Sequence, residues 1–191
     1  MARGTTANSK LRCACIGAGG RASAGIGPGL KEHLVAIAEP DLNGRGGGEI
    51  KRAKKAQSDV KIYTDYRELF DKHDDLDAVW IGRPDHNHFG SAMRAMDMGA
   101  AVYCEKPLTW SIDEAAKLRA KAAEKKIVTQ MGNQGHSSDS IRQIVEHLRG
   151  GSVGSVKKVV SHMGKKWGAA GMPQKATEPS GLDWEAWLGL I

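Results

Sequence analysis

The sequence predicts an α/β fold with a doubly wound parallel sheet, on two observations. Short β-prone segments alternate along the chain with segments of helical periodicity. Most of the β-prone segments are continuously apolar, as expected of parallel strands covered on both faces. We expect the sheet within residues 10–133, because the pattern stops after Gly151 and a loop rich in Gly and Pro follows. Residues 134–191 are then expected to be a linker helix and the incomplete start of a second domain.

The elements can be placed in order. Six strands are expected, at residues 11–17, 33–39, 60–63, 77–82, 101–105 and 126–131. Helical stripes lie at 66–73, 89–96 and 141–148, and a capping box of Ser111 and Glu114 opens a helix that runs through Lys125. Residues 24–29 contain Pro28 and three glycines, so the first helix is expected to be short or irregular. Residues 155–167 are a candidate for one more strand.

Composition and charge narrow the function classes. The net charge is +6, but the lysines are dispersed and no basic stretch is interleaved with aromatic residues, which disfavours nucleic-acid binding. No apolar run is long enough for a membrane helix, and the N-terminus lacks the pattern of a signal peptide, so we expect a cytoplasmic location. Cys13, Cys15 and Cys104 lie in apolar segments and are expected to be buried thiols.

The first strand leads into a glycine-rich turn, GAGGRA, at residues 17–22. The turn matches the pattern G-x-G-x-x-G/A of dinucleotide-binding proteins. Gly17 permits the tight turn, Gly19 lets the backbone approach a pyrophosphate, and the small Ala22 lets the next helix pack on the strand. The N-terminus of that helix offers N–H groups to phosphates. The alternative is a structural turn without a ligand.

An acidic residue follows at the expected spacing. Glu39 ends the second strand, 22 residues after Gly17, where a carboxylate would meet the ribose hydroxyls of a dinucleotide. A carboxylate repels a 2′-phosphate and therefore favours NAD over NADP. NADP stays possible, because Arg45 on the following loop could attract that phosphate. A solvated glutamate is the alternative.

Two further stretches follow the fourth and fifth strands, at the edge where α/β proteins bind ligands. His86 and His88 lack further zinc ligands at suitable spacing, so helix capping or cofactor contact is favoured over a metal site. Lys106 points to the crevice where a nicotinamide would lie. Its ammonium could assist proton transfer during hydride transfer to or from an alcohol, with Glu105 orienting it. The alternative is an ordinary loop lysine beside Pro107.

Taken together, the motifs GAGGRA, PDHNH, VYCEKPL and QMGNQGHS, in this order, resemble the Gfo/Idh/MocA oxidoreductases. A later segment, DWEAWLG at 183–189, is similar to a bacterial branch of that family. The resemblance runs from about residue 10 to the end and implies NAD(P)-dependent oxidation of a sugar or cyclitol hydroxyl, or reduction of the ketone. The family's α+β substrate domain carries an Asp/His pair, and His136 and His162 come too early to stand in for that histidine.

The resemblance also implies roles for individual residues. Gly17, Gly19 and Gly20 would bind the pyrophosphate, Glu39 the adenosine ribose, and Lys106 would be the active-site lysine. The other residues assigned to the cofactor cleft are Ala18, Arg21, Ile81, Gly82, Pro84, His86, Glu105, Pro107 and Asn133, with Gln134 beside the last. Arg83 departs from the family pattern, which usually has a small residue, often Thr, before the proline.

The C-terminal segment concentrates apolar side chains, among them Trp184, Trp187 and Leu188. We expect residues 156–191 to face a missing domain, a partner or a second copy, and the chain to be truncated, with half of its active site missing. One alternative is a non-catalytic dinucleotide-binding fragment. Another, from a different class, is a methyltransferase that uses S-adenosylmethionine, in which EKPL and GNQGHS would have no role.

Overall fold

The computed structural model describes residues 9–162 and 175–189. These residues form two compact units, one of residues 9–132 with 179–189 and one of residues 133–162 with 175–178. The assignment of residues 134–191 to a substrate domain stays a prediction. In this structure residues 179–189 group with the first unit.

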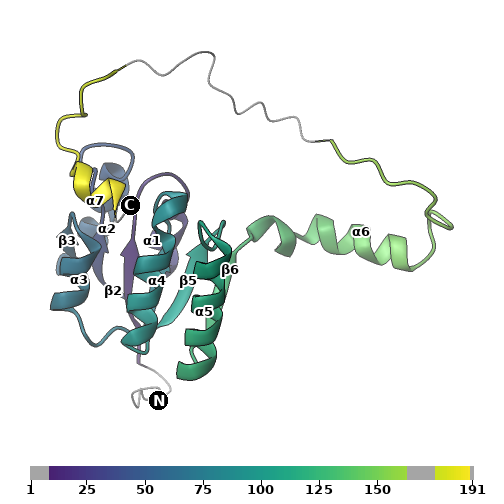
Figure 1. Cartoon of the computed structure of the whole chain (residues 1–191), viewed down its shortest axis with the longest axis horizontal. Coiled ribbons are helices and arrows are strands. Elements are labelled where there is room, and N and C mark those ends of the chain that lie inside the picture. Colours follow the sequence, from purple (N-terminus) through teal and green to yellow (C-terminus); the bar gives the residue numbers. More distant parts are fainter. Residues whose placement is uncertain (1–8, 163–174, 190–191) are drawn as a thin grey trace. The chain divides into compact units, whose positions relative to one another are not determined.

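The first unit is built on a six-stranded parallel sheet, with the strand order β3-β2-β1-β4-β5-β6 (Figure 1). The strands are β1 Arg12–Ile16, β2 His33–Ala38, β3 Lys61–Tyr63, β4 Ala78–Ile81, β5 Ala101–Glu105 and β6 Thr129–Gly132. The doubly wound fold and its six strands are therefore confirmed. Strands β2 and β3 are added on one side of β1, and β4, β5 and β6 on the other side. The order of the strands therefore switches between β1 and β4, and ligands are expected in the crevice at the carboxyl ends of these two strands.

Helices cover the two faces of this sheet (Figure 1). On one face lie α1 Ser23–Lys31 and α2 Gly47–Ala56, and on the other lie α3 Tyr66–Lys72, α4 His88–Asp97 and α5 Ile112–Lys125. The predicted capping box opens α5, because the Ser111 hydroxyl accepts from the N–H of Glu114 and the Glu114 carboxylate accepts from the N–H of Ser111. Gly99, just after α4, has a φ of +86°, the left-handed conformation that commonly follows a helix.

Helix α1, which is expected to be short or irregular, runs for nine residues with Pro28 inside it. Its glycines lie where the helix approaches the sheet closely. A Cβ at Gly25 would overlap the Trp80 indole, and one at Gly29 would lie 3.1 Å from the Leu34 side chain. Gly25 and Gly29 are thus required by packing, and Trp80, the partner of Gly25, lies far away in the sequence.

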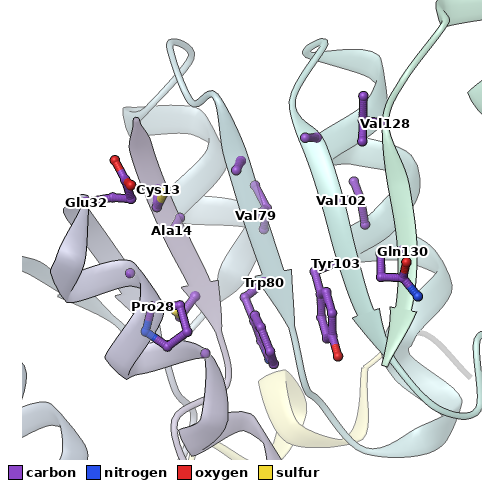
Figure 2. A pocket seen from close by; sticks show the side chains of 15 residues that line it. Cys13, Ala14, Pro28, Glu32, Val79, Trp80, Val102, Tyr103, Val128 and Gln130 are labelled. Atoms are coloured by element: carbon purple, nitrogen blue, oxygen red, sulfur yellow. The ribbon is translucent and has the colours of Figure 1, made fainter. Parts of the chain in front are cut away.

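Two clusters of apolar side chains form the core, one on each face of the sheet. On the α1 face, the apolar cover leaves a hollow of about 260 Å³ over β1, β4 and β5. Figure 2 shows Trp80 and Tyr103 side by side in this hollow, where their rings stack at 3.8 Å between centroids. The lining is almost wholly apolar, so this hollow offers little chemistry compared with the carboxyl edge of the sheet.

The second unit contains a 3₁₀ turn, Gln134–Ser137, and helix α6 Asp139–Arg149. The Ser138 hydroxyl caps α6 by accepting from the N–H of Ile141. The predicted strand at 155–167 is not formed in its described part, since residues 155–162 have no strand conformation; residues 163–167 lie outside the described residues. Within the two described ranges, no helix is both long and apolar enough to cross a lipid bilayer.

Candidate functional site

The glycine turn joins β1 to α1 and is shaped by contacts with the end of β4. Gly17 has a φ of +99° and donates its N–H to the Ala38 carbonyl at 2.7 Å. A Cβ at Gly17 would lie 2.8 Å from the Gly82 carbonyl oxygen, and a Cβ at Gly82 would lie 2.7 Å from Ala22. The three small residues therefore let β1, β4 and the start of α1 meet without side chains between them.

Glu39 lies directly beneath this turn and is only 8% exposed. Its Oε2 accepts hydrogen bonds from the N–H groups of Ala18, at 2.8 Å, and Gly19, at 3.1 Å. Its Oε1 accepts from the N–H of Asp41 at 3.1 Å. The backbone amides of the turn thus face an anionic group already, and the carboxylate is fixed at the C-terminal end of β2.

A cleft of about 440 Å³ opens in front of the turn. Its lining combines residues that follow β1, β2 and β4 with one aromatic side chain from the C-terminal segment. These residues are Gly17, Gly19, Gly20, Arg21, Glu39, Pro40, Asp41, Arg45, Gly46, Gly82, Arg83, Pro84 and Trp187. Ala18 and Ile81 are buried just behind it. Small residues, three arginines and one buried carboxylate make this cleft suited to a ligand that carries both phosphate and hydroxyl groups.

Arg83, the residue that departs from the family pattern, is buried beside this cleft. Its guanidinium lies 4.5 Å from the centre of the Tyr66 ring and donates to the Ala186 carbonyl. Burial lowers the pKa of Arg83, while the nearby Tyr66, Asp65 and Glu39 act in the opposite direction. The cation is therefore engaged in holding two parts of the first unit together as well as lining the cleft.

The C-terminal segment groups with the first unit, and the expectation that residues 156–191 face a missing domain, a partner or a second copy stays a prediction. Helix α7, Trp184–Leu188, is capped by Asp183, whose carboxylate accepts from the N–H of Ala186. The three carbonyls at its C-terminal end accept from Arg83, Asn87 and His86. Ala186 is buried and Trp187 half-buried, whereas Trp184 is 36% exposed. We call residues 179–189 the strap.

The loop after β5 is tied to the loop after β4 by a histidine. His88 is buried, and its ring nitrogens lie 2.6 Å from the Pro107 carbonyl and 2.8 Å from the Arg83 carbonyl. Glu105 is buried at the end of β5, whereas Lys106, the next residue, is exposed. The Lys106–Pro107 peptide bond is cis. Through Pro107, the backbone next to the lysine is fixed while its side chain faces solvent.

Most predicted site residues lie along one edge of the first unit. Glu105 ends β5, Lys106 and Pro107 follow it, and these three residues do not line the cleft described above. Asn133 opens the second unit, and its role toward a cofactor stays a prediction. His86 contacts the strap, and His88 contacts the loops after β4 and β5. In residues 9–162 and 175–189, no group of three or more His, Cys, Asp or Glu side chains is placed to bind a metal ion.

Sequence reasoning missed three contributors to this region. Asp41, Asn87 and Trp187 either line the cleft or fix the strap beside it. Asn87 stands within the motif PDHNH and Trp187 within DWEAWLG, so both motifs had been singled out. What connects them is a pair of hydrogen bonds from the Asn87 amide to the carbonyls of Trp187 and Leu188, and backbone carbonyls leave no trace in a sequence.

Comparison with known proteins agrees with this geometry. Residues 11–133 match the model of the Gfo/Idh/MocA family, described as an oxidoreductase family with an NAD-binding Rossmann fold. The chain belongs to this family. The Gfo/Idh/MocA match covers every strand of the sheet and each residue discussed above on the glycine turn, on Glu39 and on the two loops.

Individual relatives are similar over part of their length. The chain is 27% identical over 134 residues to D-xylose 1-dehydrogenase (NADP(+)) of Hypocrea jecorina, covering 70% of this chain and 34% of that one. It is 28% identical over 160 residues to inositol 2-dehydrogenase 4 of Saccharopolyspora erythraea, covering 77% and 43%. The chain therefore spans less than half the length of these relatives.

Solved structures show the same fold. The crystal structure of myo-inositol 2-dehydrogenase from Lactobacillus plantarum superposes with a TM-score of 0.64 at 26% identity, covering 78% of this chain and 43% of that one. An inositol dehydrogenase homolog from Azotobacter vinelandii, complexed with NAD+, superposes with a TM-score of 0.59 at 27% identity, covering 77% and 40%. None of these comparisons supports a methyltransferase.

Proposed function

We propose that this chain is the cofactor-binding part of an NAD(H)-dependent oxidoreductase that acts on a hydroxyl or ketone of a sugar or polyol. The observation that supports this most directly is the cleft in front of the glycine turn, where Glu39 is fixed between the turn and the loop after β2. The substrate class rests on the xylose and inositol dehydrogenases to which the chain is similar.

Different residues of the first unit would bind different parts of the dinucleotide. The backbone at Gly19 and Gly20 would lie against the pyrophosphate, with the first turn of α1 behind it, while the Gly19 N–H stays bonded to Glu39. Glu39 would accept the ribose hydroxyls of the adenosine, and Arg45 is placed beside it to meet a 2′-phosphate if NADP is bound instead. Bound NAD supplies a hydride acceptor and its reduced form a hydride donor.

Lys106 would supply the proton-transfer group. When an alcohol is oxidised, its hydroxyl proton must leave as the hydride is removed, and an ammonium close to the oxygen can hydrogen-bond it and relay the proton. The fixed backbone at Pro107 and the buried Glu105 would position this lysine. We propose that the surface facing Lys106 belongs to the substrate domain that the family resemblance implies.

A second candidate is a dinucleotide-binding protein without catalysis. It is favoured by the exposure of Lys106, which contrasts with the burial of Glu39. In this case the chain binds NADH but turns over no polyol, alone or as an oligomer.

Calorimetry with NADH and NADPH, followed by assays with xylose and inositols, tests both candidates. We expect binding of NADH by the wild-type chain, and, where turnover is found, its complete loss in Lys106→Ala with cofactor binding retained. Absence of binding for both cofactors would contradict the proposal. Binding without any turnover supports the second candidate, and turnover that survives Lys106→Ala would remove the lysine from the mechanism.

A further inference from the structure

The strap crosses the carboxyl edge of the sheet between two loops. Near its start, Leu182 forms an antiparallel bridge with Asp41, and the N–H of Asp183 donates to the Pro40 carbonyl at 2.9 Å. At its other end, the carbonyls of α7 accept from side chains of the loop after β4. The strap is therefore attached at the end of β2 and at the end of β4, on both sides of the glycine turn.

Trp187 is the strap residue that reaches the cleft. Its ring lies edge-on to His86, at 6.1 Å between centroids, and stacks on Trp184 at 5.2 Å. These neighbours, together with the bonds to the carbonyls of α7, fix its position. A large planar side chain is thus presented beside Gly82, Arg83 and Pro84 in a cleft whose other lining is mainly backbone and charged groups.

The contents of this cleft indicate which half of a dinucleotide the indole would meet. Glu39 and Arg45 lie on the side where the adenosine ribose would be bound, and the glycine turn lies where the pyrophosphate would be bound. Among the described residues that line it, none comes from the loop after β5, where the nicotinamide end would lie. Trp187 therefore shares its cleft with the adenosine and pyrophosphate groups.

We propose that the strap is a wall of the dinucleotide cleft and that Trp187 packs against the adenosine half of the cofactor. An adenine ring is a flat, apolar surface, and the indole is the large aromatic side chain among the residues of this cleft. This inference rests on the proposed binding of NAD(H). It adds a cofactor contact from the C-terminal segment, whereas the other binding residues belong to the loops of the sheet.

Binding of cofactor fragments tests the proposal, with NADH, ADP and reduced nicotinamide mononucleotide as probes. Trp187→Ala is expected to weaken the binding of both NADH and ADP about tenfold, which is the effect of removing an aromatic side chain on which a base stacks. Reduced nicotinamide mononucleotide, which lacks adenine, is expected to bind unchanged. Trp110→Ala is the matched control for ADP, since Trp110 is 74% exposed and lies on the loop after β5, away from the adenosine end, and it should leave the affinity for ADP unchanged.

A second measurement does not depend on removing the aromatic ring. ADP should quench the tryptophan emission of the wild-type chain, and Trp187→Phe should lose most of that quenching while keeping most of the affinity. Trp110→Phe should keep both.

The outcomes separate the two proposals. If the wild-type chain binds neither NADH nor ADP, the proposed cofactor is wrong and this inference fails with it. If the wild-type chain binds both, and Trp187→Ala leaves their affinities unchanged or tightens them, only the inference is overturned. In that case the strap is a structural element or an obstruction. If Trp187→Ala loses affinity for reduced nicotinamide mononucleotide alone, the inference about Trp187 is also overturned.

Discussion

The two ends of the sheet's carboxyl edge are built very differently. At the end formed by β1, β2 and β4, Glu39 is buried and accepts three backbone hydrogen bonds, and the strap covers the neighbouring loop. At the end formed by β5, Lys106 is exposed, although the backbone beside it is fixed by His88. The first end is a cleft with a buried, hydrogen-bonded carboxylate, and the second presents an exposed lysine on a fixed backbone.

This difference follows from what each end needs. A pyrophosphate and a ribose are recognised by backbone amides and a carboxylate that one short stretch of chain can arrange. A reacting substrate has to be enclosed from several sides, because proton and hydride transfer require fixed distances. We therefore expect changes at the first end to alter cofactor affinity strongly, and changes at Lys106 to leave that affinity alone.

The largest effect is expected from Gly19→Trp. A Cβ at Gly19 would already lie 3.1 Å from Arg45, so an indole there must project into the cleft and take the place of the phosphates. NADH affinity measured by calorimetry should fall by at least roughly a hundredfold. Gly48→Trp is the control, because a Cβ at Gly48 meets no atom within 4 Å, and it should bind NADH normally. Unchanged affinity in Gly19→Trp would show that the first end does not bind the pyrophosphate.

The cysteines test whether the two ends rest on equally buried strands. Burial raises the pKa of Cys15 on β1 and that of Cys104 on β5, the latter to about 12; burial also raises the pKa of Cys13 to about 11. Because the thiolate is the reactive form, all three should react with a disulfide reagent at pH 8 at least roughly a hundredfold more slowly than free cysteine. The rate at which each thiol reacts with the reagent should rise with pH, because the fraction of thiolate rises. Rapid labelling of Cys104 alone would mean that β5 opens to solvent. The two ends of the carboxyl edge would then differ in the burial of their strands as well as in the exposure of their site residues.

Replacing Glu39 is expected to alter the preference between NADH and NADPH, by a smaller factor than the loss of affinity in Gly19→Trp. Replacing Glu39 by Ser removes the carboxylate that repels a 2′-phosphate and leaves Arg45 to attract it, so the NADPH-to-NADH affinity ratio should rise about tenfold or more. Fluorescence titration with both cofactors measures it. The control is Glu49→Ser, an acid of α2 that pairs with Arg52. A ratio that stays constant in Glu39→Ser would place the ribose elsewhere.

The smallest effect is expected at the other end. Lys106→Ala should change NADH affinity by less than about twofold, because an exposed charge contributes little to binding in a polar surrounding. Lys51→Ala, an exposed lysine of α2, gives the baseline for removing one positive charge. A tenfold loss confined to Lys106→Ala would mean that the lysine anchors the cofactor, and the contrast between the two ends would disappear.

Much of this molecule could be predicted from local patterns. The strands follow from their apolar runs, the start of α5 from Ser111 and Glu114, and the place of Glu39 from its spacing after Gly17. Each of these depends on residues close together in the sequence or on the repeating geometry of the fold. The roles of Lys106, Glu39 and the other site residues toward a cofactor remain predictions.

Features that depend on distant residues were not predicted. Helix α1 contains Pro28 and three glycines, and its Gly25 fits against Trp80, which lies on β4 and far away in the sequence. The strap binds through residues about 100 positions away, and it does so through backbone carbonyls. Neither contact has a periodic signature, so only the three-dimensional arrangement reveals it.

One property of the strap has a consequence for how this segment can vary. Its hold on the loop after β4 depends on main-chain oxygens, which every amino acid carries. Two glycines of the strap are restricted: Gly181 has a φ of +84°, and Gly189 has a φ of +76° and a Cβ there would overlap the Asn87 amide. Many side chains can therefore be exchanged on this segment without releasing it, whereas inserting or deleting a single residue before Gly189 would misalign every acceptor at once. Homologous chains should accordingly preserve the length of this stretch more strictly than its composition.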